Sequence, residues 1–247
     1  MVAALILLCL LGLSMLVNFS QFFSNFMVTP GVGYTHVAGP RIEEVLMEEG
    51  YGSDKIAVIE ALLGKCNALC IGGAMANTLL AAQGFDMKKS LYEADWLAKG
   101  RTLLETAKSK GVDLVLPTDV VTGTGIDATS GTTVKANAVP DGEMALDIGP
   151  ETVQAFAQRV ATAKTVFWNG PMGLFENKAF AAGTNGIAQA VADSSGFTVV
   201  GGGDSVAAVK AAGDAVLKKI GFISTGGGAS LELVEGKKLP GVEALRP

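Results

Sequence analysis

Four short glycine-rich turns are the segments of this sequence best suited to bind a ligand, and each follows an apolar segment of strand character. They are Ile71–Gly73 (IGG), Trp168–Gly173 (WNGPMG), Val200–Ser205 (VGGGDS) and Ser224–Ser230 (STGGGAS). Glycine lets the backbone approach a ligand closely, and a helix that follows presents free N–H groups to an anion. One such turn often serves packing alone, whereas four of them together indicate a site for a phosphate-bearing ligand.

Three charged residues lie close to predicted turns or helix starts. Asp204 follows three glycines at a predicted helix start, so it is either the N-cap of that helix or a Mg²⁺ ligand beside nucleotide phosphates. Glu176 follows the WNGPMG turn, where it either accepts hydrogen bonds from a ribose or is an ordinary solvated acid. Lys55 begins a predicted helix against the preference of the helix dipole, which favours a bound anion nearby.

The elements that position these residues alternate between helices and short apolar strands from residue 55 onward. The apolar spacing predicts helices over 55–65, 74–83, 93–110, 150–163, 178–193 and 205–212, and strands over 68–71, 113–117, 165–168, 197–200 and 221–224. The polar stretch 120–142 is predicted to be a surface loop or a small hairpin. This alternation predicts an α/β fold, a doubly wound parallel sheet with helices on both faces. The glycine turns would then share the carboxyl edge of the sheet, where such folds bind ligands.

The composition excludes some classes of protein. Of the 247 residues, 49% are hydrophobic and only 6% aromatic, which suits a closely packed sheet-and-helix core. The net charge of −5 leaves no basic surface for nucleic acid. Three cysteines give no disulfide framework, and we expect Cys66 and Cys70 to be small buried apolar residues.

The first 40 residues differ from the rest because they contain no Asp, Glu, Lys or Arg. Residues 2–17 are almost entirely apolar. Three interpretations stay open: a membrane anchor or export signal, a segment from a wrong gene start or frameshift, and a buried core helix. We therefore divide the chain into a leader, 1–40, and an α/β domain, 41–247. We expect removal of the leader to leave the domain intact.

Taken together, the motifs resemble the second half of phosphoglycerate kinase, from about Ser53 to Pro247. The segments that carry the resemblance are SDKIAVIEALL, CIGGAMANTLLAAQG, LVLPTDVV, MALDIGPET, VFWNGPMGLFE, VVGGGDSVAAV and ISTGGGASLELVEGKKLPGVEAL. They occur in the family's order and at its spacing. The glycine runs match a dinucleotide-binding dehydrogenase poorly, because no G-x-G-x-x-G followed by an acid occurs at a first βα turn.

The resemblance implies phosphoryl transfer between 1,3-bisphosphoglycerate and ADP, giving 3-phosphoglycerate and ATP, with Mg²⁺. By matching position, it implies an adenine pocket of Gly72, Gly73 and Leu146, a nucleotide cleft lined by Asn169, Gly173 and Leu174, and a ribose contact by Glu176. It implies phosphate contacts by Gly202, Gly203, Asp204 and Ser205, with Asp204 on Mg²⁺. It assigns charge stabilisation on the transferring group to Lys55 and to the amides of Gly226, Gly227 and Gly228.

Two departures from the family pattern bear on function. The family's GGAKV strand and turn is replaced by residues 48–52, EEGYG, and the half that binds 3-phosphoglycerate is absent. One hypothesis is a fragment that binds MgATP or MgADP and needs the other half for turnover. The second is a non-catalytic nucleotide-binding or interaction protein tethered to a membrane through residues 1–25. The family itself is cytoplasmic and monomeric.

Overall fold

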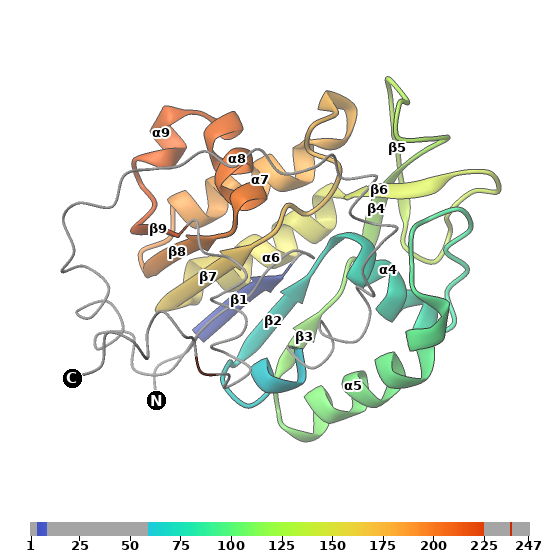
Figure 1. Cartoon of the computed structure of the whole chain (residues 1–247), viewed down its shortest axis with the longest axis horizontal. Coiled ribbons are helices and arrows are strands. Elements are labelled where there is room, and N and C mark those ends of the chain that lie inside the picture. The colour runs from blue at the N-terminus through green and yellow to red at the C-terminus, as the bar shows by residue number, and fades with distance from the viewer. Residues whose placement is uncertain (1–3, 9–58, 225–237, 239–247) are drawn as a thin grey trace.

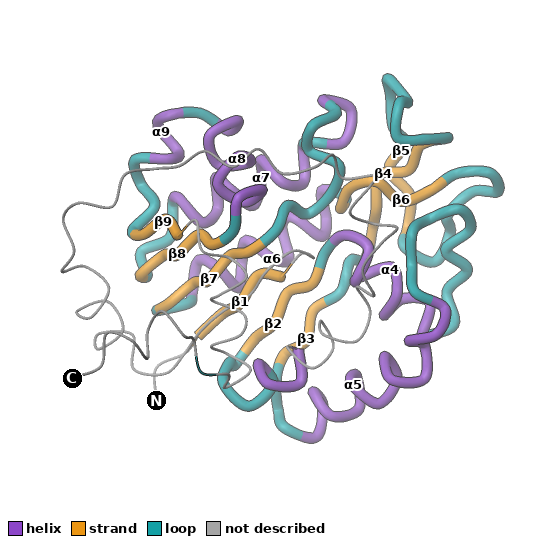
Figure 2. Tube along the Cα trace, viewed as in Figure 1, coloured by secondary structure: helices purple, strands orange, loops and turns teal. Residues whose placement is uncertain are grey.

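The computed structural model describes residues 4–8, 59–224 and 238, and it contains two sheets (Figures 1 and 2). The larger sheet is parallel throughout, with six strands in the order β3-β2-β1-β7-β8-β9. Its strands are β1 Ala4–Leu8, β2 Ala68–Ile71, β3 Asp113–Val115, β7 Thr165–Asn169, β8 Phe197–Gly201 and β9 Phe222–Ser224. The smaller sheet is antiparallel, in the order β5-β4-β6, from β4 Asp119–Gly123, β5 Thr132–Lys135 and β6 Met144–Ile148.

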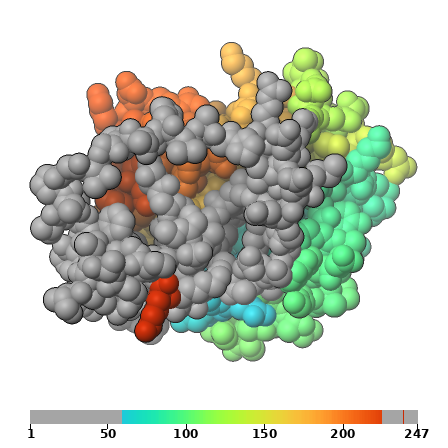
Figure 3. All heavy atoms as spheres, in the orientation of Figure 1, coloured from blue at the N-terminus to red at the C-terminus, as the bar shows by residue number. Residues whose placement is uncertain are grey.

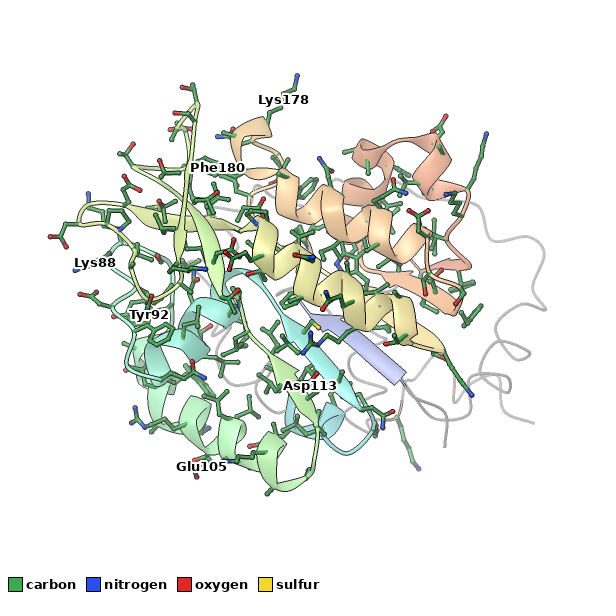
Figure 4. All side chains as sticks on the ribbon, turned by 180° about the vertical axis from the view of Figure 1, so that it is seen from behind. Lys88, Tyr92, Glu105, Asp113, Lys178 and Phe180 are labelled. Carbon is green, nitrogen blue, oxygen red and sulfur yellow. The ribbon has the colours of Figure 1, made fainter. Side chains whose placement is uncertain are left out.

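Helices cover both faces of the parallel sheet. They are α4 Gly73–Ala82, α5 Leu97–Ser109, α6 Pro150–Thr162, α7 Ala182–Ala192, α8 Gly203–Ala212 and α9 Asp214–Leu217, with 3₁₀ helices η1 Ala94–Trp96 and η2 Lys178–Phe180. Seen from behind, α6 and α7 lie over the strands (Figure 4). The predicted doubly wound α/β architecture is confirmed, and each predicted strand from residue 68 onward is present with shifts of one or two residues at its ends.

The strands bury alternate side chains on opposite faces, because successive side chains point to opposite sides of a sheet. Cys70, Trp168 and Val200 pack with α6, α7 and α8 in one apolar core. Leu69 and Phe167 pack in a second core, with α4 and α5. Apolar residues at consecutive strand positions are therefore needed on both faces, which is why these strands read as short uninterrupted apolar runs.

Cys66 and Cys70 are buried and free, as expected. Burial raises the pKa of the Cys66 thiol to about 12, and raises that of Cys70 as well. Both residues therefore act as small apolar groups of the core.

The region predicted as a polar surface loop or small hairpin is only partly as expected. Strands β4 and β5 do form a hairpin, but β4 is no surface segment, since four of its five residues are buried. Strand β6, which pairs with the other side of β4, was not predicted. In the space-filling view the hairpin projects at one end of the molecule (Figure 3). The small sheet thus adds a second layer beside the edge where β2 and β7 end.

Five residues of the predicted leader form a strand at the centre of the large sheet. Ala4–Leu8 pairs in parallel with β2 on one side and with β7 on the other. A five-residue apolar sequence suits a strand with neighbours on both sides. None of the three interpretations of the leader predicted a strand here. Residues 9–40, like the replaced segment 48–52, lie outside the described residues, so the division at residue 40 stays a prediction.

No helix among the residues that the structure describes combines the length and the apolar character needed to cross a bilayer.

Candidate functional site

The carboxyl ends of the parallel strands form one continuous rim. The pairing register places Ile71, Leu8, Asn169, Gly201 and Ser224 in a row across β2, β1, β7, β8 and β9. Three of the predicted glycine turns leave directly from this row, as expected. The fourth begins after Ser224, and its glycines Gly226, Gly227 and Gly228 lie outside the described residues, as does Lys55.

The turns after β2 and β7 pack directly against each other. Gly72 precedes α4 and lies so close to Met172 that a Cβ on Gly72 would be 2.8 Å from the Met172 Sδ. Met172 is fully buried. Gly73 adopts φ +62°, a left-handed conformation that glycine accepts without strain. Gly72, one of the two predicted adenine-pocket glycines, is therefore in close contact with the WNGPMG turn.

Hydrogen bonds to three other elements hold the backbone of the WNGPMG turn. The Gly170 N–H donates to Ser205 Oγ of α8, and the Met172 N–H donates to Thr184 Oγ1 of α7 at 2.9 Å. The Leu174 N–H donates to the Leu146 carbonyl of β6 at 2.8 Å. Sequence reasoning placed Ser205 on a phosphate, and the structure shows its buried hydroxyl bound to the neighbouring turn. The turn is thus fixed from both sides of the rim.

Gly173 is required by close packing in the same turn. A Cβ at this position would lie 2.4 Å from the Leu146 carbonyl oxygen and 2.5 Å from the Asp147 Cα. These are backbone atoms, so no side-chain rotation would relieve the clash. Leu146 and Leu174, two predicted nucleotide contacts, are brought together by this approach.

Asn169 is the most unusual residue of the rim. Its side chain is fully buried, and neither Nδ2 nor Oδ1 has a hydrogen-bond partner in the part of the chain that the structure describes. A buried amide left unpaired costs about 1–3 kcal/mol. Asn169 lies at the middle of the rim, next to Gly201, where an added Cβ would be 3.2 Å from its Nδ2. A polar ligand group at this point would remove the cost.

The first residue of α8, Gly203, is exposed, whereas the preceding Gly202 is buried. Gly202 is the N-cap with φ +92°, and no side chain caps the helix. Asp204 therefore is not the N-cap, which corrects one of the two sequence interpretations. It lies two positions after the N-cap and is partly exposed. The residue before it, Gly203, is exposed, and a Cβ added there would meet nothing within 4 Å. The first N–H groups of a helix lack partners within it, so this terminus suits an anion.

The predicted ribose contact, Glu176, is exposed on the wall of an open depression of about 660 Å³. Residues 126–129 of the β4–β5 hairpin form one wall, and Leu174 with residues 176–179 forms the other. Among the described residues no group of three or more His, Cys, Asp or Glu side chains is placed to hold a metal. A single carboxylate such as Asp204 still suits Mg²⁺, which keeps several waters and takes phosphate oxygens.

Asp147 is a residue that sequence reasoning missed. It is buried on β6, and its carboxylate accepts hydrogen bonds from the Gly183 N–H at 2.6 Å and from the Ile148 N–H at 2.9 Å. Desolvation by burial raises the pKa of this carboxyl to about 7, although both hydrogen bonds act in the opposite direction. The signal in the sequence was an acid inside the apolar run MALDI. Asp147 attaches the first turn of α7 to the strand that supports Gly173.

Comparison with known proteins places this site in a family. The profile of the phosphoglycerate kinase family matches residues 52–237. Phosphoglycerate kinase of Anaeromyxobacter sp. (strain Fw109-5) is 55% identical over 194 residues, which are 78% of this chain and 48% of the relative. That of Moorella thermoacetica is 58% identical over 194 residues, 78% of this chain and 49% of the relative.

Solved structures agree with the sequence relatives. The structure of phosphoglycerate kinase from Coxiella burnetii is 42% identical, with a TM-score of 0.73, and the match covers 78% of this chain and 50% of that one. The chain thus spans about half the length of the relatives it matches. The family's profile, the identity to its members and the shared fold agree, and this chain belongs to the phosphoglycerate kinase family.

Proposed function

We propose that this chain binds ADP and ATP as their Mg²⁺ complexes at the carboxyl edge of the parallel sheet. It would be the nucleotide-binding half of an enzyme that transfers a phosphoryl group between 1,3-bisphosphoglycerate and ADP, giving 3-phosphoglycerate and ATP. The observation that carries the proposal is the buried, unpaired amide of Asn169 at the middle of the rim. Buried polar groups in folded proteins are nearly always hydrogen-bonded, and a nucleotide at the rim would supply Asn169 with the partner that the described residues do not.

The phosphates fit the start of α8. The N–H groups that follow Gly202 have no partner inside the helix, and the exposed Gly203 leaves room for a phosphate to approach. The Asp204 carboxylate would hold Mg²⁺, which supplies charge neutralisation on the phosphate oxygens when bound. Ser205 would act indirectly, because its hydroxyl receives the Gly170 N–H and so keeps Asn169 and the α8 start together.

The nucleoside fits between the small sheet and the turn after β2. Gly72, Gly73 and Leu146 would border the adenine, and Gly173 and Leu174 would line the cleft toward the ribose. Glu176 would accept hydrogen bonds from the ribose hydroxyls. Each of these contacts rests on family resemblance together with the packing of the turns against each other and against β6.

The chemistry would need no protein nucleophile. Phosphoryl transfer is catalysed by positioning and by stabilising charge, roles we propose for Lys55 and for the amides of Gly226, Gly227 and Gly228. We place the phosphoglycerate site on the half of the relatives that this chain does not span. The partners would be small molecules, and the compartment the cytoplasm. The alternative, a membrane-tethered protein, would show itself by cosedimentation with vesicles that depends on residues 1–25.

Titration calorimetry of MgADP into the whole chain tests the proposal. We expect a dissociation constant at or below about 1 mM, which corresponds to about −4 kcal/mol. Asp204→Asn should weaken MgADP binding about tenfold or more, and should leave the binding of ADP in EDTA unchanged, because only the metal contact is lost.

Asp214→Asn is the matched control, since Asp214 is exposed in the first turn of the neighbouring helix α9. It should bind MgADP as the unaltered chain does. No binding of MgADP by the unaltered chain would reject the proposed function. Equal MgADP affinity in Asp204→Asn would reject only the placement of the metal.

A further inference from the structure

The side chain of Asn177 joins two segments that are about 50 residues apart in the sequence. Its Nδ2 donates to the Ile126 carbonyl at 2.9 Å and to the Ala128 carbonyl at 2.8 Å. Its Oδ1 accepts from the Ala179 N–H at 3.0 Å and so caps η2. One amide thereby connects the tip of the β4–β5 hairpin, residues 124–131, to the segment that carries Glu176.

A second contact supports the same joint from its apolar side. The fully buried Phe180 ring lies against the hairpin, where a Cβ on Gly123 or on Gly131 would be 2.7 Å from a ring atom. Figure 4 shows Phe180 between the hairpin and η2, with Lys178 pointing away from the molecule. The hairpin therefore packs on Phe180 at its base and is held by Asn177 at its tip.

Only an amide side chain can make this set of contacts. Two of its three hydrogen bonds need an N–H donor facing a carbonyl oxygen, and the third needs an acceptor. A carboxylate would keep the acceptor but would place negative charge against two carbonyl oxygens. Asn177→Asp is therefore nearly isosteric, yet it should open the joint.

The joint fixes the backbone on the far side of Glu176. On the near side, the Leu174 N–H is already held by the Leu146 carbonyl. Glu176 is exposed, and among the described residues its carboxylate forms no hydrogen bond or ion pair. The walls of the depression beside it come from the two segments that Asn177 connects.

We propose that Asn177 is a positioning residue that sets the selectivity of this chain for ribonucleotides. By holding the hairpin against the segment 176–180, it fixes the Glu176 carboxylate where it can accept hydrogen bonds from both ribose hydroxyls. The inference rests on the proposed function, because it takes the ligand to be an adenine nucleotide whose ribose faces Glu176.

The test compares nucleotides that differ by one hydroxyl. MgADP, its 2′-deoxy analogue and its 3′-deoxy analogue are titrated into the whole chain and into Asn177→Asp, Asn177→Ala and Glu176→Ala. We expect the unaltered chain to prefer MgADP about fivefold over at least one analogue, the value of one hydrogen bond. Asn177→Asp and Asn177→Ala should reduce this preference to less than about twofold, and should change the affinity for that analogue little.

The controls separate positioning from general damage. Asn137→Asp makes the same charge change at an exposed residue after β5 and should keep the preference. In Glu176→Ala, which has no group to contact the ribose, the preference should be lost already, and adding Asn177→Asp should change nothing further. An Asn177 variant that loses affinity for all three nucleotides equally, with its preference intact, would overturn the inference.

Hydrogen exchange without nucleotide tests the joint by itself. The amides of residues 124–131 should exchange faster in Asn177→Asp than in Asn137→Asp. Unchanged exchange would overturn the inference even where nucleotide binding is normal. Failure of the unaltered chain to bind MgADP would instead reject the proposed function, and the selectivity role with it, while faster exchange would still identify Asn177 as a structural joint.

Discussion

At the scale of single residues, the polar side chains near the rim fall into two groups. Ser205, Thr184 and Asp147 all accept hydrogen bonds from backbone N–H groups, and these bonds hold the turn after β7 and the start of α7 in place. Asn169 has no partner among the described residues, and Asp204 is partly exposed at an uncapped helix start. The side chains of the first group already have partners within the fold, and we propose that those of the second group bind the ligand.

Asp147 should make the stability of the domain depend on pH. Its pKa is raised from 3.8 to about 7 by burial, so between these values the folded state holds a proton that the unfolded state has lost. Stability therefore falls as pH rises from about 4 to 7, by at most about 1.4 kcal/mol per pH unit. Asp147→Asn should flatten this part of the profile, as measured by urea unfolding at pH 5, 6, 7 and 8.

Asp193→Asn is the matched control for that measurement. Asp193 is exposed and pairs with Lys219, and the resulting hydrogen bond lowers its pKa, so its removal should leave the slope between pH 5 and 8 as it was. Equal slopes for Asp147→Asn and the unaltered chain would show that Asp147 stays ionised in the folded state throughout this range.

The sequence predicted the residues of the rim better than the residues that hold it. Gly72, Asn169 and Gly202 lie in runs whose composition alone indicates a tight strand-to-helix turn. Asp147 and Thr184 act on backbone N–H groups 36 and 12 residues away, and local patterns carry no signal for such contacts. Asp204 shows a second limit of sequence-based prediction. The N-cap of α8 is Gly202, two positions before Asp204, and which of the two residues caps the helix depends on the φ of Gly202.

At the scale of elements, the strands that the sequence predicted have clear local patterns, and the strands that it did not predict lack them. Strands β2, β7 and β8 consist mainly of buried residues. β7 ends at Asn169 and β8 at Gly201, and Gly72 follows β2 directly, so both the type and the ends of these strands can be predicted from the sequence. Strand β6 is only partly buried over its first three residues, so MALDI shows no clear period. Strand β1 lies within a long apolar run, where periodicity does not separate a strand from a helix or a membrane span.

Strand β1 changes what we expect from removal of the leader. Without Ala4–Leu8, the facing edges of β2 and β7 would lose their backbone partners on the inner side of the sheet. Deletion of residues 1–8 should therefore abolish cooperative urea unfolding followed by circular dichroism. Ile6→Pro should cost about 2 kcal/mol or more by removing a ladder donor, whereas Ile6→Val should cost about 1 kcal/mol at most.

Cooperative unfolding of the chain without residues 1–8 would contradict this prediction for β1. A chain without residues 1–8 that unfolds cooperatively, with the midpoint of the whole chain, would show that β1 contributes nothing to the sheet. The leader would then be a separate segment, as the division at residue 40 predicts.

At the scale of the whole molecule, we propose that the rim is one wall of a site that closes against a second part. The described turns place the groups proposed to bind phosphate and nucleoside along a single edge, and the chain spans about half the length of its relatives. Enzymes that transfer groups between two bound substrates commonly bring two parts together around them, and the closure excludes water. A chain with one wall can therefore bind nucleotide and still lack turnover.

Adding in trans the half of a relative that this chain does not span should give phosphoryl transfer. The half of the Moorella thermoacetica enzyme that does not align with this chain is a suitable partner, because the other half of that enzyme is 58% identical to this chain. In a coupled assay of ATP formation from 1,3-bisphosphoglycerate and MgADP, neither part alone should be active. Activity should rise with the concentration of either part and disappear on dilution, because two separate parts lack the effective concentration that a covalent link provides.

The Asp204→Asn chain should fail in the same mixture, and the Asp214→Asn chain should succeed, which ties the activity to the proposed metal contact. Turnover by the chain alone would mean that the acceptor site lies within it. A mixture that binds MgADP but never forms ATP would favour the hypothesis of a non-catalytic nucleotide-binding protein. The nucleotide site at the rim would then be intact, but the chain would lack the surface against which the other half must close.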